Sequence, residues 1–352
     1  MRNPTFDIAK FLVMIGVIAG HLVGNGLVVK AQIFQPQLSN AIIGVSMPFF
    51  FMVSGYFSAK SLEGSDWAKH IARIVGFMWP LFAFGLVFAS ILYFTGSRSL
   101  LGAALHPFGR VIGGSWFLRT MAIVYLLAAI VFRTGRRRVQ IVSAILMYIA
   151  LVFSPKEGAF AWSASVMHMY PYFMFGALVL KSYELYAHHL IAVLSGLVFC
   201  VVVFFEGNCR TNGMAFYWVS ADWHDMLLSL HGFVCFVGRT VVGITGSIFL
   251  LWLIDRIILL IPKVGWLGQF GTTTLGVYVM HEWPMAQLSK AGLMQGFSSL
   301  VQWPLALLLF FVFHYLTLGI RAVPRLKFFF FGDEKWLAEK LRQNKFFGKI
   351  LA

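Results

Sequence analysis

The chain has 352 residues, of which 59% are hydrophobic and only 12% are charged, a composition that excludes a water-soluble globular domain. The formal net charge of +15 would suit a nucleic-acid partner, but the basic residues cluster between apolar segments, as they do in membrane proteins. We therefore expect a lipid bilayer as partner and no nucleic acid.

Ten apolar runs of membrane-spanning length predict an all-α polytopic membrane protein with about ten transmembrane helices. Their approximate ranges are 8–29, 40–60, 71–95, 113–132, 138–154, 168–182, 188–205, 229–254, 268–289 and 298–320. Most lysines and arginines lie in alternate connecting segments, starting with the N-terminal one, which places both termini in the cytoplasm. We expect a transmembrane domain over 1–325 and a basic amphipathic cytoplasmic tail over 326–352.

The first run contains two ionisable residues, Lys10 and His21. Eleven helical positions make about three turns, so the two side chains share one face, about 16 Å apart along the axis. His21 is a candidate general base; the alternative is a histidine satisfied by hydrogen bonds between helices. Lys10 is a candidate phosphate contact, with a cytoplasmic-surface anchor as the alternative. Asp7, one turn earlier, can pair with Lys10 or hold it in place.

The second run contains Ser54 next to Gly55. We interpret these small residues as a place where a backbone or a ligand comes close, which makes Ser54 a candidate cofactor contact. A nucleophilic Ser54 is disfavoured, because the sequence places no base to activate it.

Two arginines lie inside apolar runs. Arg119, in the fourth run, can clamp a phosphate, a carboxylate or a developing oxyanion, and a structural ion pair with a buried acid is the alternative. Arg239, near the middle of the eighth run, has the same two interpretations, and we assign it to cofactor binding.

The ninth run ends in His281 and Glu282. Counting residues from the predicted helix ends places His21, Arg119 and the His281–Glu282 pair in one layer in the outer part of the membrane. These four are our candidate catalytic residues. The alternative for His281 and Glu282 is that they are polar residues at a helix end in the membrane–water interface.

The sequence predicts no metal cofactor, because its three cysteines have neither zinc spacing nor a disulfide-framework pattern. The longest predicted outer loop, about 206–228, contains Asp222, His224 and Asp225 among aromatic residues. We interpret it as a solvated loop with an interfacial tryptophan belt, in preference to a metal or sugar site.

Four passages in this order resemble the integral-membrane acyltransferase family 3: Asp7…Lys10-x10-His21, Pro48–Tyr56, Ser115–Arg119 and Leu275–His281. The resemblance implies ten helices, cytoplasmic termini, and transfer of an acyl group, usually acetyl, from cytoplasmic acyl-CoA to a hydroxyl. The implied acceptor is a cell-envelope glycan or lipid-linked saccharide, and the implied location is a bacterial inner membrane. The family's catalytic base falls on His21. Its arginine falls on Lys10, a departure that loses bidentate phosphate geometry.

This resemblance fits the residue pattern. Lys10 would hold the donor's phosphates, the thioester would reach His21, and Arg119 or His281 would stabilise the oxyanion. The alternative function is a transporter or flippase for a saccharide or small solute, in which the buried His, Arg and Glu residues relay protons. The absence of an internal repeat in the sequence counts against it.

Overall fold

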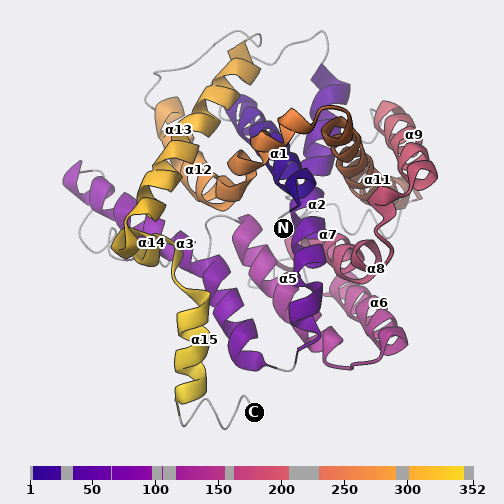
Figure 1. The fold of residues 1–352 in the computed structure, drawn as a ribbon, viewed down its shortest axis with the longest axis horizontal. Helices are drawn as coiled ribbons and strands as arrows, with labels where there is room; N and C mark the ends of the chain where they lie inside the picture. Colours follow the sequence, from indigo (N-terminus) through magenta and orange to yellow (C-terminus); the bar gives the residue numbers. More distant parts are fainter. Residues whose placement is uncertain are drawn as a thin grey trace. The chain divides into compact units, whose positions relative to one another are not determined.

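The computed structural model describes residues 3–24, 35–64, 66–96, 105, 116–154, 162–205, 230–290 and 301–344. Every regular element in these ranges is helical, so the predicted all-α class is confirmed (Figure 1). The elements are α1 (Pro4–Gly24), α2 (Gln35–Leu62), α3 (Trp67–Phe94), α5 (Trp116–Phe132), α6 (Arg137–Phe153), α7 (Trp162–Phe175), η2 (Gly176–Leu180), α8 (Lys181–Tyr183), η3 (Leu185–Ala187), α9 (His189–Phe205), α11 (Leu230–Leu260), η5 (Pro262–Thr273), α12 (Thr274–Lys290), α13 (Gln302–Ala322), α14 (Pro324–Phe331) and α15 (Glu334–Gln343).

Eight of the ten predicted apolar runs each overlap one of these helices, with ends that differ by a few residues. The run 168–182 is divided among α7, η2 and α8, and the run 268–289 is divided between η5 and α12. Four helical stretches in the described ranges are long and apolar enough to cross a membrane: Pro4–Leu22, Trp67–Phe94, Val237–Leu260 and Gln302–Ala322. Two further helices, Trp116–Phe132 and His189–Val203, are apolar but shorter. The helices therefore coincide with the apolar pattern of the sequence.

The chain forms two compact units. The first unit comprises Met1–Phe57 and Pro171–Leu318, and the second comprises Ser58–Tyr170 and Gly319–Ala352. Both units are discontinuous in sequence, because the boundaries between them fall within α2, α7 and α13.

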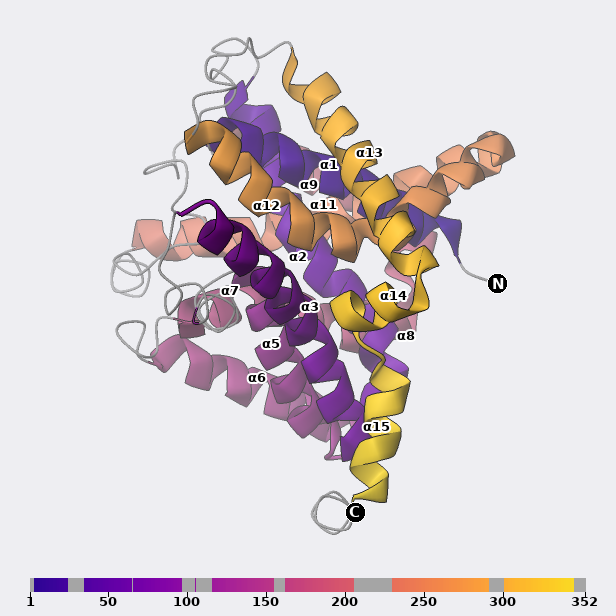
Figure 2. The same ribbon diagram turned by 90° about the vertical axis from the view of Figure 1, so that its left-hand side faces the viewer.

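In the first unit, α1 lies beside α12 and α13 (Figure 2). The side-chain amide of Gln302 donates to the carbonyl oxygen of Ala19 at 2.9 Å. The rings of Phe11 and Phe310 meet at the other end of the contact, with centroids 4.8 Å apart. These pairs show that α13 runs antiparallel to α1.

A close backbone contact joins α2 to the end of α7. A Cβ atom added at Gly55 would overlap the carbonyl of Phe173, and one added at Gly176 would overlap the carbonyl of Met52. Each glycine therefore accommodates the backbone of the other helix, as small residues do in membrane interfaces. This is the backbone approach that we predicted for the Ser54–Gly55 pair.

The segment before α12 differs from the prediction. We expected one helix over 268–289, but η5 continues as a 3₁₀-helix to Thr273, and α12 begins at Thr274. The reason lies in Gly268 and Gly271, whose spacing of three aligns them on one stripe of a 3₁₀-helix that faces Asp7. A Cβ at Gly271 would overlap the carbonyl of Asp7, so this stripe brings η5 against the start of α1.

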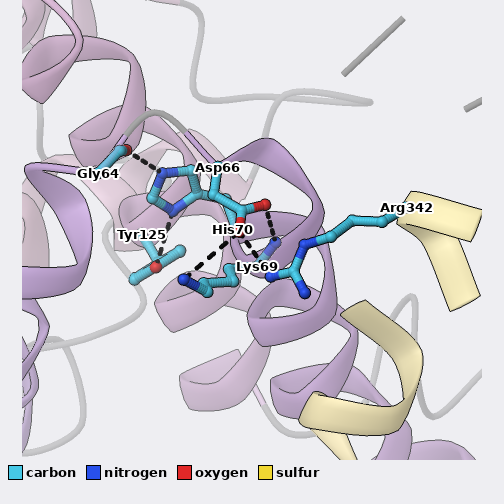
Figure 3. Close-up of polar contacts among 6 residues, drawn as sticks. All are labelled: Gly64, Asp66, Lys69, His70, Tyr125 and Arg342. Carbon is cyan, nitrogen blue, oxygen red and sulfur yellow. Dashed lines mark hydrogen bonds and ion pairs between the residues drawn. The ribbon is translucent and has the colours of Figure 1, made fainter. Parts of the chain in front are cut away.

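In the second unit, His70 of α3 is bonded at both ring nitrogens (Figure 3). Its Nε2 lies 3.1 Å from the carbonyl oxygen of Gly64, and its Nδ1 lies 3.0 Å from the hydroxyl of Tyr125 on α5. A carbonyl only accepts, so Nε2–H donates and Nδ1 accepts from Tyr125. His70 thus ties α5 to the chain before α3 and has no unsatisfied nitrogen.

The C-terminal segment also belongs to the second unit, where α14 and α15 lie along α3 (Figures 1 and 2). The indole N–H of Trp79 donates to the carbonyl oxygen of Phe329 at 2.8 Å, and Arg342 donates to Asp66 at 2.6 Å. The predicted boundary at 325 falls within α14. Gly332, with φ +67°, separates α14 from α15.

Candidate functional site

The imidazoles of His21 and His281 lie against each other in the first unit. Their centroids are 5.0 Å apart and their planes make an angle of 67°. His21 is half-buried near the C-terminal end of α1, whereas His281, on α12, is only 1% exposed. The structure therefore brings together two of the predicted catalytic residues.

The backbone of α12 fixes the proton on His281. Its Nδ1 lies 2.7 Å from the carbonyl oxygen of Tyr278 and 3.2 Å from that of Val277. Because carbonyl oxygens only accept, Nδ1 carries the hydrogen when the ring is neutral. Nε2 is then left with its lone pair, and it is buried without a hydrogen-bond partner among the described residues. A buried acceptor of this kind is costly in a purely structural histidine.

Glu282 completes this group from the next position of α12. It is half-buried, and its carboxylate interacts electrostatically with His21. Adjacent helical residues diverge by about 100°, so His281 and Glu282 approach His21 from different sides. We name His21, His281 and Glu282 the imidazole site.

At the other end of α1, Lys10 and Asp7 form an ion pair with Nζ and Oδ1 2.6 Å apart. Asp7 is 4% exposed, and its backbone is covered by Gly271. The Lys10 side chain is 18% exposed. The pairing is the one predicted from their spacing, and it gives the buried carboxylate its counter-charge.

The structure also describes the other predicted site residues, Ser54, Arg239 and Arg119. Ser54 is half-buried on α2, beside the backbone contact of Gly55. Arg239, on α11, is half-buried, and its carbonyl oxygen accepts a hydrogen bond from the hydroxyl of Tyr172 at 3.2 Å. Arg119 is half-buried on α5, in the second unit. Its membership of the predicted layer remains a prediction.

Sequence reasoning missed one polar residue near the imidazole site. Gln302, at the start of α13, is buried and donates to the carbonyl of Ala19, one half-turn before His21. The only signal was a polar residue at the edge of an apolar run, a pattern that also fits an interfacial helix end.

The predicted loop with Asp222, His224 and Asp225 lies outside the described residues. Within the described ranges, no group of three or more His, Cys, Asp or Glu side chains is placed to hold a metal ion.

A comparison with protein families matches residues 3–319 to the family of the acyltransferase domain numbered 3. Neither the curated proteins nor the solved structures include a match to this chain. The family match covers essentially the whole chain, including the imidazole site, the Lys10–Asp7 pair and both arginines. The chain belongs to the membrane acyltransferase family 3.

Proposed function

We propose that this protein transfers an acyl group, most simply acetyl, from cytoplasmic acyl-CoA to a hydroxyl of a cell-envelope glycan or lipid-linked saccharide. The observation that supports the proposal best is the imidazole site, in which half-buried His21 lies against buried His281, whose Nδ1 proton is fixed and whose Nε2 lone pair is unsatisfied. Acyl transfer to a hydroxyl needs a neutral nitrogen base in a position of this kind.

The donor would lie along α1. The Lys10–Asp7 pair provides a cation at the N-terminal end of the helix, and His21 lies eleven positions further, about 16 Å along the axis. The phosphates of acyl-CoA and its thioester are separated by the long pantetheine arm. A single extended donor could therefore place its phosphates at Lys10 and its thioester at the imidazole site.

In the reaction, the acceptor oxygen attacks the thioester carbonyl while His21 takes the hydroxyl proton. The tetrahedral intermediate then collapses, the C–S bond breaks, and the thiolate of CoA recovers the proton from His21. Glu282 stabilises the imidazolium that forms on His21, since its negative charge attracts a positive charge on that ring. His281, whose Nδ1–H is held by the backbone, keeps a lone pair available beside it.

The remaining expectations complete the proposal. Ten transmembrane helices place both termini in the cytoplasm of a bacterium, with the protein in its inner membrane and the segment 326–352 on the cytoplasmic side. Arg119 or His281 stabilises the oxyanion, and Ser54 and Arg239 contribute to donor binding.

Radiolabelled acetyl-CoA tests the function directly. The purified protein in detergent would receive the labelled donor and crude lipid-linked glycan, with the His21→Ala variant in parallel. We expect label to move to the glycan only with the native protein. Retained transfer by a folded His21→Ala variant would remove the base assignment, and failure of the native protein to bind acetyl-CoA would remove the function.

A further inference from the structure

A second cluster of side chains lies where α1 begins and α2 ends in the first unit. The ring of Phe6 packs on Tyr56, Phe57 and Tyr186, with centroid distances of 4.7, 5.1 and 5.5 Å. Phe6, Tyr56 and Tyr186 are buried, but Phe57 is 51% exposed. The aromatic cluster therefore ends in a ring whose surface is open to a planar ligand.

A lysine lies directly beside this cluster. The ammonium of Lys181 lies 4.5 Å from the centroid of the Tyr56 ring, and the residue is exposed. Within the described part of the chain, no ion pair joins Lys181 to a carboxylate, whereas Lys10 and Arg256 are paired with Asp7 and Asp255. The charge of Lys181 is thus available to an exogenous anion.

The backbone holds Lys181 in this place by an uncommon arrangement. After α7 the chain continues as the π-helix η2, in which the N–H of Lys181 bonds the carbonyl of Gly176. Glu184 then takes a left-handed conformation with φ 45°, the only non-glycine residue of the described chain with positive φ. Both features cost free energy and are found most often at functional sites. Gly176 fixes one end of the turn against α2, and Lys181 meets Tyr56 at the other.

We propose that Phe57 and Lys181 form the site for the nucleotide end of the donor. The planar base stacks on Phe57, and a phosphate pairs with Lys181. The inference rests on the proposed function, which makes acyl-CoA the donor. Acyl-CoA carries phosphate both on its ribose and in its pyrophosphate, so it can engage two separate cations.

The position of the cluster relative to Lys10 supports this assignment. Phe6, the centre of the aromatic cluster, precedes Lys10 by one turn of α1. The two lysines therefore flank one stretch of α1. Lys10 would receive the pyrophosphate and Lys181 the ribose phosphate, while the pantetheine arm continues along α1 toward His21.

Binding measurements on the full-length protein in detergent test the site. Isothermal titration with CoA and with adenosine 3′,5′-bisphosphate would compare the native protein with the Lys181→Gln and Phe57→Leu variants. We expect Lys181→Gln to lower the affinity for both ligands about fivefold and Phe57→Leu to lower it about tenfold. Lys181→Arg should keep most of the affinity. Turnover with acetyl-pantetheine, which lacks the nucleotide, should be the same in all four proteins.

Lys60→Gln is the matched control, because Lys60 is also exposed and lies one turn beyond Phe57 on α2. Lys60→Gln should leave the affinities for CoA and for adenosine 3′,5′-bisphosphate unchanged. If it lowered them as much as Lys181→Gln does, the effect would come from net charge and the proposed site would be overturned. Native CoA affinity in Lys181→Gln and Phe57→Leu would overturn this inference alone. Failure of the native protein to bind CoA would overturn the proposed function with it. The melting temperature without ligand identifies a variant that is misfolded, in which case Lys181→Arg carries the comparison.

Discussion

The Nδ1–H of His281 donates to the carbonyl oxygen of Tyr278 at 2.7 Å, so the helix that carries this imidazole also determines its tautomer. A histidine in a membrane helix can satisfy its own N–H in this way without a partner from another helix. The consequence is that the opposite nitrogen, beside His21, is an acceptor whenever the ring is neutral.

Replacing His281 should therefore affect catalysis more than folding. We expect His281→Asn, which keeps an N–H near the backbone carbonyls but has no Nε2, to lower kcat at least tenfold with little change in the KM for the donor. Steady-state transfer from acetyl-CoA measures both. His189→Asn is the control, because His189 is exposed and accepts a hydrogen bond from Trp252. Unchanged kcat in His281→Asn would make His281 a structural residue.

Lys10 should determine affinity for the donor. We expect Lys10→Ala to weaken acetyl-CoA binding, since the ion pair with Asp7 is lost together with the cation. Lys10→Arg should preserve or improve it, because a guanidinium can bind phosphate through two nitrogens. The thermal shift caused by acetyl-CoA measures the effect. If acetyl-CoA shifted the melting temperature of the Lys10→Ala variant as much as that of the native protein, Lys10 would be only an anchor of membrane topology.

Gly271 should position the Lys10–Asp7 pair. A Cβ there would overlap the carbonyl of Asp7, so we expect Gly271→Ala to destabilise the protein by about 1–3 kcal/mol and to weaken donor binding as well. Gly20→Ala, on α1, is the control, since nothing lies within 4 Å of its added Cβ. Denaturation followed by helical circular dichroism compares the two. Equal stability of both variants would contradict the close contact.

Acid should loosen the C-terminal segment at Asp66. Burial acts to raise the pKa of Asp66, but the hydrogen bond from Arg342, together with the contacts of Lys69, lowers it overall. The ionised carboxylate of Asp66 therefore stabilises the docked segment at pH values above the pKa of Asp66 in the unfolded chain, about 4. This contribution is lost as the pH falls through the lower pKa of Asp66 in the folded protein. Limited proteolysis of α15 between pH 7 and pH 3 should show increasing cleavage. In the Asp66→Asn variant, α15 should be cleaved readily at every pH. Protection of α15 as in the native protein would contradict the role assigned to ionised Asp66.

Glu334 should behave in the opposite way. Burial raises the pKa of its carboxyl above the ordinary value, against the attraction of Arg73 at 3.8 Å. The Glu334 side chain is 46% exposed, so solvent screens most of this effect: the ionised form costs little stability at neutral pH, and that cost disappears as the pH falls through the raised value. We expect Glu334→Gln to leave the melting temperature at pH 7 unchanged or raised. A clear drop would show that the distant ion pair outweighs burial.

Much of the fold follows from the apolar pattern, because a helix in lipid must satisfy its own backbone and must be long enough to cross. The spacing of Lys10 and Asp7 indicated that they could pair or that Asp7 could hold Lys10 in place, and the structure shows the ion pair. The meeting of His21 with His281 came from matching the depths of two helices, but depth cannot say which helices are neighbours. That choice is made by packing, for instance by Gln302 against Ala19.

The elements that the sequence did not predict depend on backbone geometry. The hydropathy of a sequence does not distinguish an α-helix from a π-helix or a 3₁₀-helix, so the prediction did not separate η2 and η5 from the helices they adjoin. Lys181 was consequently not among the predicted site residues. The C-terminal segment was treated as a surface helix because the sequence does not show that Asp66 and Arg342, 276 positions apart, meet.

The 3₁₀ character of η5 sets the distance between its contact with Asp7 at the start of α1 and the contact of His281 with His21 near the end of α1. A 3₁₀-helix rises about 2.0 Å and turns about 120° per residue, against about 1.5 Å and 100° for an α-helix. If one three-residue turn of η5 before Thr274 became α-helical, α12 would advance about 1.5 Å less and rotate by about 60°. His281 would then leave its place beside His21, while the contact of η5 with Asp7 could remain. The point at which one helix type gives way to the other thus sets the register of the histidine pair.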